Sequence, residues 1–231
     1  ASAVCAAGFH NVLFMGPPGS GKTMAARRIA SLLPDLTDTE NREVARIYSM
    51  RGIDGGRSGR RPPVRVPHHG ASMEGNLCPC GKLGRPDTTC MCSIQEIARY
   101  WRRLGGALLD RVEVRVRSYY RDHSTNTMSQ EELKLRVHGA IRRQIARSGD
   151  GRYLANGLVP PEEIEERLPL SAGLRRLLRT RMKQAGLSDR AAAGVRSVAR
   201  TLADLDDRAD VEAKDILEAT GLRLPGPEQL A

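Results

Sequence analysis

Eight consecutive residues near the start of the sequence have the composition of a phosphate-binding loop. Residues 16–23 read Gly-Pro-Pro-Gly-Ser-Gly-Lys-Thr and fit the pattern G-x-x-x-x-G-K-[ST] in full. Glycines let the backbone curl around phosphates, the lysine ammonium reaches the β- and γ-phosphates, and the threonine hydroxyl coordinates Mg²⁺. The alternative is a chance glycine turn. The pattern favours a site for ATP and Mg²⁺, with contacts from Gly16, Gly19, Ser20, Gly21, Lys22, Thr23 and Met24.

Four of the five cysteines form a second candidate site. They are spaced as two C-x-C pairs within 15 residues, and Gly81 and Gly84 supply turns between the pairs. Four thiolates can surround one Zn²⁺ tetrahedrally, although C-x-C is a tighter spacing than the usual C-x₂-C. A structural zinc site and a set of reduced cysteines packed in a loop are both open. The candidate ligands are Cys78, Cys80, Cys90 and Cys92, whereas Cys5 is expected to be a small buried hydrophobe.

Hydrolysis of ATP needs an acidic residue at the tip of a neighbouring strand, which holds the water bound to Mg²⁺. The usual sign is an apolar run followed by two acidic residues. Asp54 lies in a glycine loop, Glu74 follows no apolar run, and Asp110 precedes its strand. The sequence therefore lacks a recognisable second acidic motif.

The elements that would position these residues are predicted from periodicity and capping patterns. A buried strand at 11–15 leads into the phosphate loop, and a helix at 22–33 follows it. Alternating valines predict a second strand at 111–117. Capping boxes at Thr37, Ser93 and Ser129 predict three further helix starts. Helices at 162–168, 171–185, 188–205 and 211–219 complete a small helical bundle.

Charge is distributed unevenly along the 231 residues. The chain has 37 basic and 27 acidic residues, and residues 160–231 hold 12 basic and 13 acidic ones, so residues 1–159 carry a net charge of +11. Such an excess points to a polyanion, although arginine-rich composition alone is weak evidence. Aromatic residues make up 3%, which argues against base stacking as the binding mode. No apolar run reaches the length of a membrane helix, and no secretory leader is visible.

Motifs along nearly the whole chain resemble the magnesium-chelatase-like AAA+ ATPases, in particular the bacterial competence-protein ComM (YifB) group. They are Ala-Ala-Gly-Phe-His-Asn at 6–11 with the phosphate loop, Pro-His-His-Gly-Ala-Ser at 67–72, Asn-Leu-Cys-Pro-Cys-Gly at 76–81, Cys-Met-Cys at 90–92, Ile-Ala-Arg-Tyr at 97–100, Leu-Leu-Asp-Arg-Val at 108–112 and Val-Ala-Arg-Thr-Leu-Ala-Asp-Leu at 198–205. The resemblance also implies a Lon-protease-like N-terminal domain, which is not expected within these 231 residues. In the family a long stretch, including the second acidic motif and two strands, separates the Pro-His-His hairpin from the Asn-x-Cys-Pro-Cys motif. Here Gly75 runs directly into Asn76. Either the gene is deleted at that point, or residues are left out of the sequence; the second is favoured because such a deletion should not fold well.

The resemblance also implies roles for three residues. Asn76 resembles the polar residue that orients the attacking water, and Arg111 the arginine finger offered to the neighbouring subunit's nucleotide. Arg190 resembles the arginine that reports the γ-phosphate to the lid, although Gly194 replaces a basic residue often found there. The alternatives are a loop asparagine, a solvent-exposed arginine at a strand start and a surface helix residue. His10 is expected to pack near the adenine, and His68 and His69 to be features of a hairpin.

The expected fold is α/β: a P-loop AAA+ core at 1–119, with an apparently incomplete sheet, followed by an all-α lid at 120–231. The expected function is ATP hydrolysis in an oligomeric ring, a hexamer by resemblance, that acts on DNA as a branch-migration motor in recombination during natural transformation. The catalytic candidates are Lys22, Asn76 and Arg111. One alternative is a magnesium-chelatase subunit driving metal insertion into a porphyrin. Another is a nucleotide-binding module without hydrolysis. A location in the bacterial cytoplasm and no contact with a membrane are expected.

Overall fold

The computed structural model describes residues 1–50, 52, 60–64, 76–85, 87–103, 109–118, 128–148 and 155–223. The helices of this part are α1 (Ser2–Gly8), α2 (Lys22–Leu32), α3 (Asp38–Ser49), α4 (Ile94–Arg102), α6 (Gln130–Arg147), α7 (Ile164–Arg167), α8 (Ala172–Gln184), α9 (Asp189–Leu205) and α10 (Ala213–Arg223). Two 3₁₀ turns, η2 (Asn156–Leu158) and η3 (Pro161–Glu163), precede α7. The stretch 51–70 is rich in Gly, Pro and Arg and is expected to form a basic loop or hairpin. Most of it, with His68, His69 and Asp54, lies outside the described residues, as do Glu74 and Gly75.

The described part of the sheet has two parallel strands. β1 (Val12–Met15) pairs with β2 (Val114–Arg117) in a register that places Val12 opposite Val114 and Met15 opposite Arg117. Both strands were predicted from the sequence and are slightly shorter than expected. Because the strands are parallel, the loop after β1 lies at the carboxyl edge of the sheet, and the residues before β2 lie at its amino edge.

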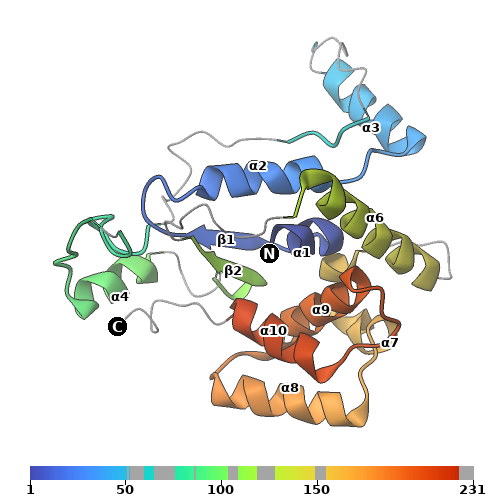
Figure 1. Cartoon of the computed structure of the whole chain (residues 1–231). Helices are drawn as coiled ribbons and strands as arrows, with labels where there is room; N and C mark the ends of the chain where they lie inside the picture. Colours follow the sequence, from blue (N-terminus) through green and yellow to red (C-terminus); the bar gives the residue numbers. More distant parts are fainter. Residues whose placement is uncertain are drawn as a thin grey trace.

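The largest apolar core joins the sheet to the helical half. It contains Ala6 and Ala7 of α1, Val114 of β2, and buried side chains of α2, α6, α8, α9 and α10. Figure 1 shows α1 beside β1, with α6, α9 and α10 around the same centre. The helix α1 was not predicted; Val4 to Gly8 are all buried, so it forms under tertiary packing rather than from an amphipathic pattern. A division at residue 119 stays a prediction, because this core draws on both sides of it.

A second, smaller core lies under the cysteines. Met15, Leu77, Cys78, Ile97 and Trp101 are each at most 7% exposed and pack together. The indole N–H of Trp101 donates to the carbonyl oxygen of Leu77 at 3.1 Å, which ties α4 to the cysteine segment. This core therefore connects the end of β1 to the cysteines.

All three capping boxes predicted from the sequence are present. The hydroxyls of Thr37, Ser93 and Ser129 accept from the backbone N–H three residues on, where a glutamate side chain returns the contact to the cap residue's N–H. These boxes fix the starts of α3, α4 and α6. Between them, α3 buries no residue and stands away from the rest of the molecule in Figure 1.

Candidate functional site

Residues 16–21 connect the end of β1 to the start of α2. Gly19 and Gly21 have φ values of 80° and 82°, a left-handed conformation in which a side chain would be strained. Gly21 is the N-cap of α2 and offers no side chain to the first-turn amides. No side chain therefore caps this end of α2, where the first-turn N–H groups and the positive end of the helix dipole favour a bound anion.

Gly16 is enclosed at the point where the loop leaves the sheet. A Cβ atom there would lie 2.4 Å from the carbonyl oxygen of Ser118 and 2.7 Å from Oγ of Ser20. The backbone N–H of Ser118 in turn donates to the carbonyl oxygen of Met15 at 2.7 Å. Only glycine fits this close approach. The buried Oγ of Ser20 has no hydrogen-bond partner among the described residues, which is what a cradle awaiting an anionic ligand would show.

The ammonium of Lys22 lies over the loop. Its Nζ donates to the carbonyl oxygens of Gly16 and Pro17, both at 2.8 Å. Thr23 and Met24 are exposed on the first turn of α2. The residues that the sequence assigned to ATP and Mg²⁺ are thus brought together, and their chemistry fits a phosphate chain: loop amides, one cation and a hydroxyl.

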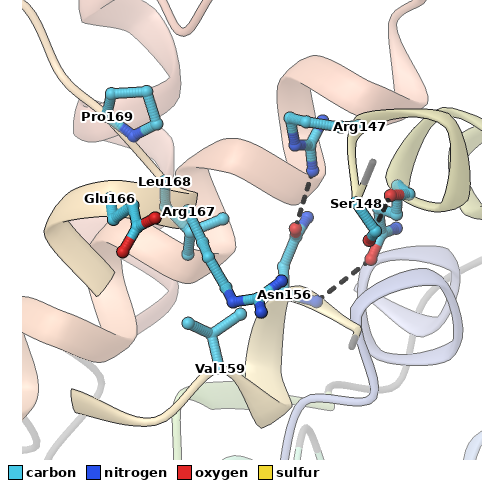
Figure 2. Close-up of a pocket in the computed structure, with 9 residues that line it drawn as sticks. Arg147, Ser148, Asn156, Val159, Glu166, Arg167, Leu168 and Pro169 are labelled. Atoms are coloured by element: carbon cyan, nitrogen blue, oxygen red, sulfur yellow. Dashed lines mark hydrogen bonds between the residues drawn. The ribbon is translucent and has the colours of Figure 1, made fainter. Parts of the chain in front are cut away.

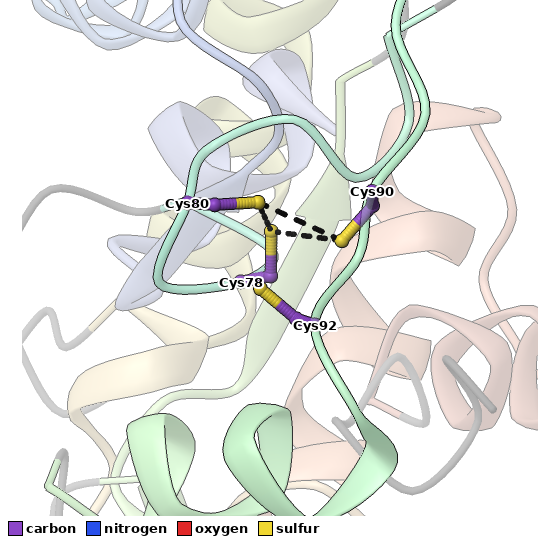
Figure 3. A group of neighbouring side chains, drawn as sticks. All are labelled: Cys78, Cys80, Cys90 and Cys92. Carbon is purple, nitrogen blue, oxygen red and sulfur yellow. Dashed lines mark hydrogen bonds between the residues drawn. The ribbon is translucent and has the colours of Figure 1, made fainter.

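The four cysteines converge from two segments of one loop (Figure 3). All four Sγ atoms lie within 4.8 Å of one another. The distances are 3.4 Å from Cys78 to Cys80, 3.7 Å from Cys80 to Cys90 and 3.6 Å from Cys90 to Cys78. Zn–S bonds of about 2.3 Å place the sulfurs of a regular tetrahedron about 3.8 Å apart. The arrangement is therefore close to that of a tetrathiolate metal site.

The surroundings of these sulfurs also suit a metal site. Gly81 and Gly84 have φ values of 70° and 81°, so glycines make the turn that brings the two pairs together. The N–H of Leu83 donates to Sγ of Cys78 at 3.4 Å. A backbone hydrogen bond from Lys82 lowers the pKa of the Cys80 thiol to about 7, whereas desolvation raises the pKa of Cys90 to about 12. The cysteines thus differ in their readiness to ionise before any metal binds.

The residues carried over from the family lie in different places. Asn76 is half-buried and immediately precedes the buried Leu77. Its Nδ2 lies 3.8 Å from the point where a Cβ on Gly81 would sit, and that point is 3.6 Å from the ring of Pro18. Asn76 is therefore close to the phosphate loop, as expected for a residue that orients water.

Arg111 and Arg190 are both exposed and lie near the opposite, amino edge of the sheet. The carbonyl oxygen of Arg111 accepts from the Asn11 side chain, just before β1. Ser188, the N-cap of α9, donates to Asp110 at 2.8 Å, so the first turn of α9, with Arg190, lies beside the start of β2. A Cβ on Gly194 would lie 3.1 Å from Cγ of Glu113, so a larger residue there would require that side chain to shift slightly. Neither arginine is placed at its own chain's phosphate loop.

A buried polar network around Asp204 was not predicted from the sequence. Asp204, fully buried, accepts from Arg147 at 2.8 and 3.1 Å, from Arg200 at 2.9 Å and from Asn156 at 2.9 Å. Asn156 also donates to Thr201, whose hydroxyl is hydrogen-bonded to Nε2 of His10 at 2.8 Å. His10 is thus held in the interior; whether adenine lies nearby stays a prediction.

A cavity of about 320 Å³ opens beside this network (Figure 2). Gln144, Arg147 and Ser148 line it from α6 and its end, with Asn156 of η2 and the segment from Glu166 to Pro169. Arg147 and Asn156, its central polar groups, are hydrogen-bonded to each other at 2.9 Å. The cavity is separate from the residues of the phosphate loop, and its polar side chains already serve the network.

Comparison with known proteins identifies the family. The model of "Magnesium chelatase, subunit ChlI" matches residues 1–75 and 74–126, and that of the subunit's C-terminal region matches residues 127–223. The chain belongs to the magnesium chelatase subunit ChlI family. This family is one of AAA+ ATPases, and the resemblance to its ComM group is borne out by relatives with that name.

Relatives align with almost the whole chain. The competence protein ComM of Haemophilus influenzae is 26% identical over 291 residues, covering 95% of this chain and 57% of that protein. An uncharacterised protein of Mycobacterium tuberculosis is 26% identical over 297 residues, covering 96% of this chain and 59% of its own length. YifB of Escherichia coli is 49% identical over 71 residues, 30% of this chain and 14% of that protein. The chain thus spans less than two thirds of the length of these relatives.

The alignments also bear on the junction between Gly75 and Asn76. In the ComM comparison, 95% of 231 residues is about 219, so about 72 of the 291 aligned positions have no counterpart in this chain. The first family model matches in two pieces that meet at residues 74 and 75. The match to the family model is thus divided at the junction where the resemblance implies a longer stretch.

Among the helices of the described residues, none has the length and apolar character to cross a bilayer.

Proposed function

We propose that the chain is the ATP-binding module of a ring-forming, magnesium-chelatase-like ATPase that acts on DNA in the bacterial cytoplasm. The observation that carries the proposal is the geometry of residues 16–23. Left-handed glycines, an open helix start and the Lys22 ammonium meet at one loop. The unpartnered Oγ of Ser20 faces the same loop.

In this proposal the phosphates replace the loop's own oxygens as partners of Lys22. The ammonium leaves the carbonyl oxygens of Gly16 and Pro17 and binds the β- and γ-phosphates, while the amides after Gly19 hold the remaining charge. Thr23 and Met24 lie exposed on the first turn of α2, and the Thr23 hydroxyl would be the protein ligand for Mg²⁺. Bound Mg²⁺ would neutralise charge on the phosphates.

The placement of two arginines favours an assembled ring. Arg111 and Arg190 lie near the amino edge of the sheet, whereas the phosphate loop lies at the carboxyl edge. An arginine finger on the far edge can serve a nucleotide only in a neighbouring subunit. We therefore infer a closed homo-oligomeric ring, a hexamer by resemblance to the family. In this ring Arg111 would be the arginine finger and Arg190 the γ-phosphate sensor.

DNA is the polymer that the charge distribution favours. The net charge of +11 on residues 1–159 suits a phosphodiester backbone better than a porphyrin. The Haemophilus relative is named a competence protein, and we extend that role, recombination of DNA during natural transformation, to this chain as part of the proposal. The rival is a subunit that drives metal insertion into a porphyrin.

We also propose that Cys78, Cys80, Cys90 and Cys92 bind one structural Zn²⁺. The near-tetrahedral spacing of their sulfurs supports this assignment. Metal analysis of the purified chain should find about one zinc per chain; reduced thiols without metal would contradict it.

Calorimetric titration with Mg·ATP tests the nucleotide site. Lys22→Ala should abolish measurable binding, while Lys214→Ala, an exposed lysine on α10, should bind as the parent does. Equal binding by both variants would contradict the proposal.

Two further readouts separate the rivals. A steep fall of DNA affinity with salt supports DNA, whereas a flat dependence counts against it. Phosphate release measures turnover: bound ATP without turnover would favour the non-hydrolysing module, because the second acidic motif is missing from this sequence.

A further inference from the structure

We propose that a metal ion held by the four cysteines braces the phosphate loop, so that nucleotide affinity depends on occupancy of the metal site. The brace is the cysteine knuckle, defined here as residues 76–85 and 87–92. The inference rests on the proposed nucleotide site and adds a positioning role for the metal. It follows from the way the knuckle packs on the loop.

The knuckle faces the loop through its two left-handed glycines. A Cβ on Gly81 would lie 3.6 Å from both Cγ and Cδ of Pro18, and one on Gly84 would lie 3.8 Å from Cδ of Pro17. An added methyl group would therefore be in van der Waals contact with each proline, so the turn between the cysteine pairs lies next to the two prolines. Proline has no N–H to offer a phosphate, and these two residues act as the contact surface of the loop.

A metal ligand also belongs to the core beneath the loop. Cys78 is 0% exposed and packs with Leu77, Met15 and Trp101, which are 2%, 1% and 2% exposed. Met15 is the residue immediately before Gly16. The position of Cys78 is therefore transmitted to the phosphate loop both from beneath, through Met15, and from the side, through the prolines.

The described residues of the knuckle contain no helix or strand. Leu77 and Cys78 are held by the small core and by the Trp101 hydrogen bond. Two backbone bonds close turns within the knuckle, from Gly81 to Cys78 and from Arg85 to Lys82, both at 3.1 Å. The two cysteine pairs meet mainly through their sulfurs, which as thiolates repel one another unless a cation lies between them. A bound metal converts that repulsion into four bonds and closes the loop.

The same brace places Asn76. Asn76 begins the knuckle, and its side-chain amide nitrogen and the ring of Pro18 lie 3.8 and 3.6 Å from the point where a Cβ on Gly81 would sit. A loosened knuckle would displace this side chain together with the loop. We therefore treat the cysteines as positioning residues, which act on the nucleotide through Pro17, Pro18 and Asn76.

The metal arm of the test uses the full chain and does not involve nucleotide. Protein stripped of metal under reducing conditions is titrated with Zn²⁺ or Co²⁺, and the ligand-field absorption of tetrahedral Co²⁺–thiolate reports binding. Trp101, the single tryptophan, is hydrogen-bonded to Leu77 beside Cys78, so its fluorescence reports closure of the knuckle. One equivalent of metal should saturate both signals.

The nucleotide arm compares affinities for a fluorescent ATP analogue in excess Mg²⁺. Metal-free protein should bind at least tenfold more weakly than zinc-loaded protein, and added Zn²⁺ should restore the affinity. Cys80→Ser and Cys92→Ser should behave like metal-free protein, while Cys5→Ala, which removes a cysteine of α1 outside the knuckle, should not. Pro18→Ala should bind zinc normally yet respond less to it, because the contact surface is reduced.

The outcomes are distinguishable. Zinc binding with unchanged nucleotide affinity would overturn the brace and leave the proposed nucleotide site intact, as would a failure to bind any metal. Zinc-loaded protein that changes Trp101 fluorescence but binds no nucleotide would overturn the proposed function, and the brace with it. Far-UV circular dichroism of the stripped protein should stay near that of loaded protein; a collapse of helicity would show a general folding role and overturn the specific one.

Discussion

The Asp204 network gathers polar groups from distant parts of the chain, whereas the phosphate loop draws its polar groups from one short segment, and the two differ in how their central groups are hydrogen-bonded. Asp204 accepts four hydrogen bonds from Arg147, Arg200 and Asn156 in an interior closed by helices. The phosphate loop has no side-chain cap on α2 and leaves the buried Oγ of Ser20 without a partner among the described residues. The hydrogen-bonded Asp204 carboxylate stabilises the interior, whereas the uncapped helix start and the Ser20 hydroxyl are available to a ligand. Substitutions in the two regions should therefore affect different observables.

The largest stability effect is expected at Asp204. Asp204→Ala leaves Arg200, 5% exposed, without its carboxylate partner and should lower the free energy of unfolding by about 3–5 kcal/mol. Asp206→Ala, two residues on, removes only surface ion pairs and should cost at most about 1 kcal/mol. Lys22→Ala should leave stability within about 0.5 kcal/mol. Urea denaturation followed by circular dichroism measures all three; similar midpoints for the two aspartate variants would break the contrast between the regions.

A substitution at Gly16 tests how closely the phosphate loop packs against the end of β2. Gly16→Ala places a Cβ 2.4 Å from the backbone oxygen of Ser118, so the loop or the end of β2 must shift. Such overpacking should cost about 1–3 kcal/mol and weaken nucleotide binding together with it. The matched control is Gly221→Ala in α10, where nothing lies within 4 Å of the added Cβ. That change should raise stability by about 0.5–1 kcal/mol through helix propensity. Equal effects of the two alanines would refute the close fit.

A region can be predicted from the sequence when the residues that form it lie close together along the chain. This holds for the phosphate loop, the cysteine pairs and the three capping boxes, because the spacing of their residues within a short stretch implies their geometry. The Asp204 network is not: His10 and Thr201 are 191 residues apart, and nothing local marks either as a partner. The helix α1 was missed for the same reason, because its residues are buried on all sides by packing. The edge on which Arg111 lies became apparent only from the parallel register of β1 and β2.

His10 gives the Asp204 network a pH dependence. Burial lowers the pKa of His10 from 6.5 to about 3. The unfolded chain takes up a proton below about pH 6.5 and the folded chain does not, so this contribution is fully present above pH 6.5 and is lost as pH falls toward 3. Stability should decrease by about 1.4 kcal/mol per pH unit in this window, or about 2 kcal/mol between pH 6.5 and 5. His10→Gln should flatten that slope; an unchanged slope would show that another group is responsible.

The smallest effects should separate the two regions most finely, because the same capping change can be made in each. Ser129→Ala and Ser93→Ala remove identical capping boxes, from α6 in the helical half and from α4 under the cysteine knuckle. Each should cost about 1 kcal/mol of local helix stability.

The α6 residues Val137, Ala140 and Ile141 belong to the large core, so the loss at Ser129 should appear in global unfolding. The helix α4 packs in the small core with Met15 and Cys78, so the loss at Ser93 should appear first in Trp101 fluorescence and in metal affinity, with little change in the global midpoint. If both variants shift the global midpoint equally and leave Trp101 unchanged, the knuckle and the helical half unfold as one unit, and the metal would then stabilise the whole molecule rather than the phosphate loop.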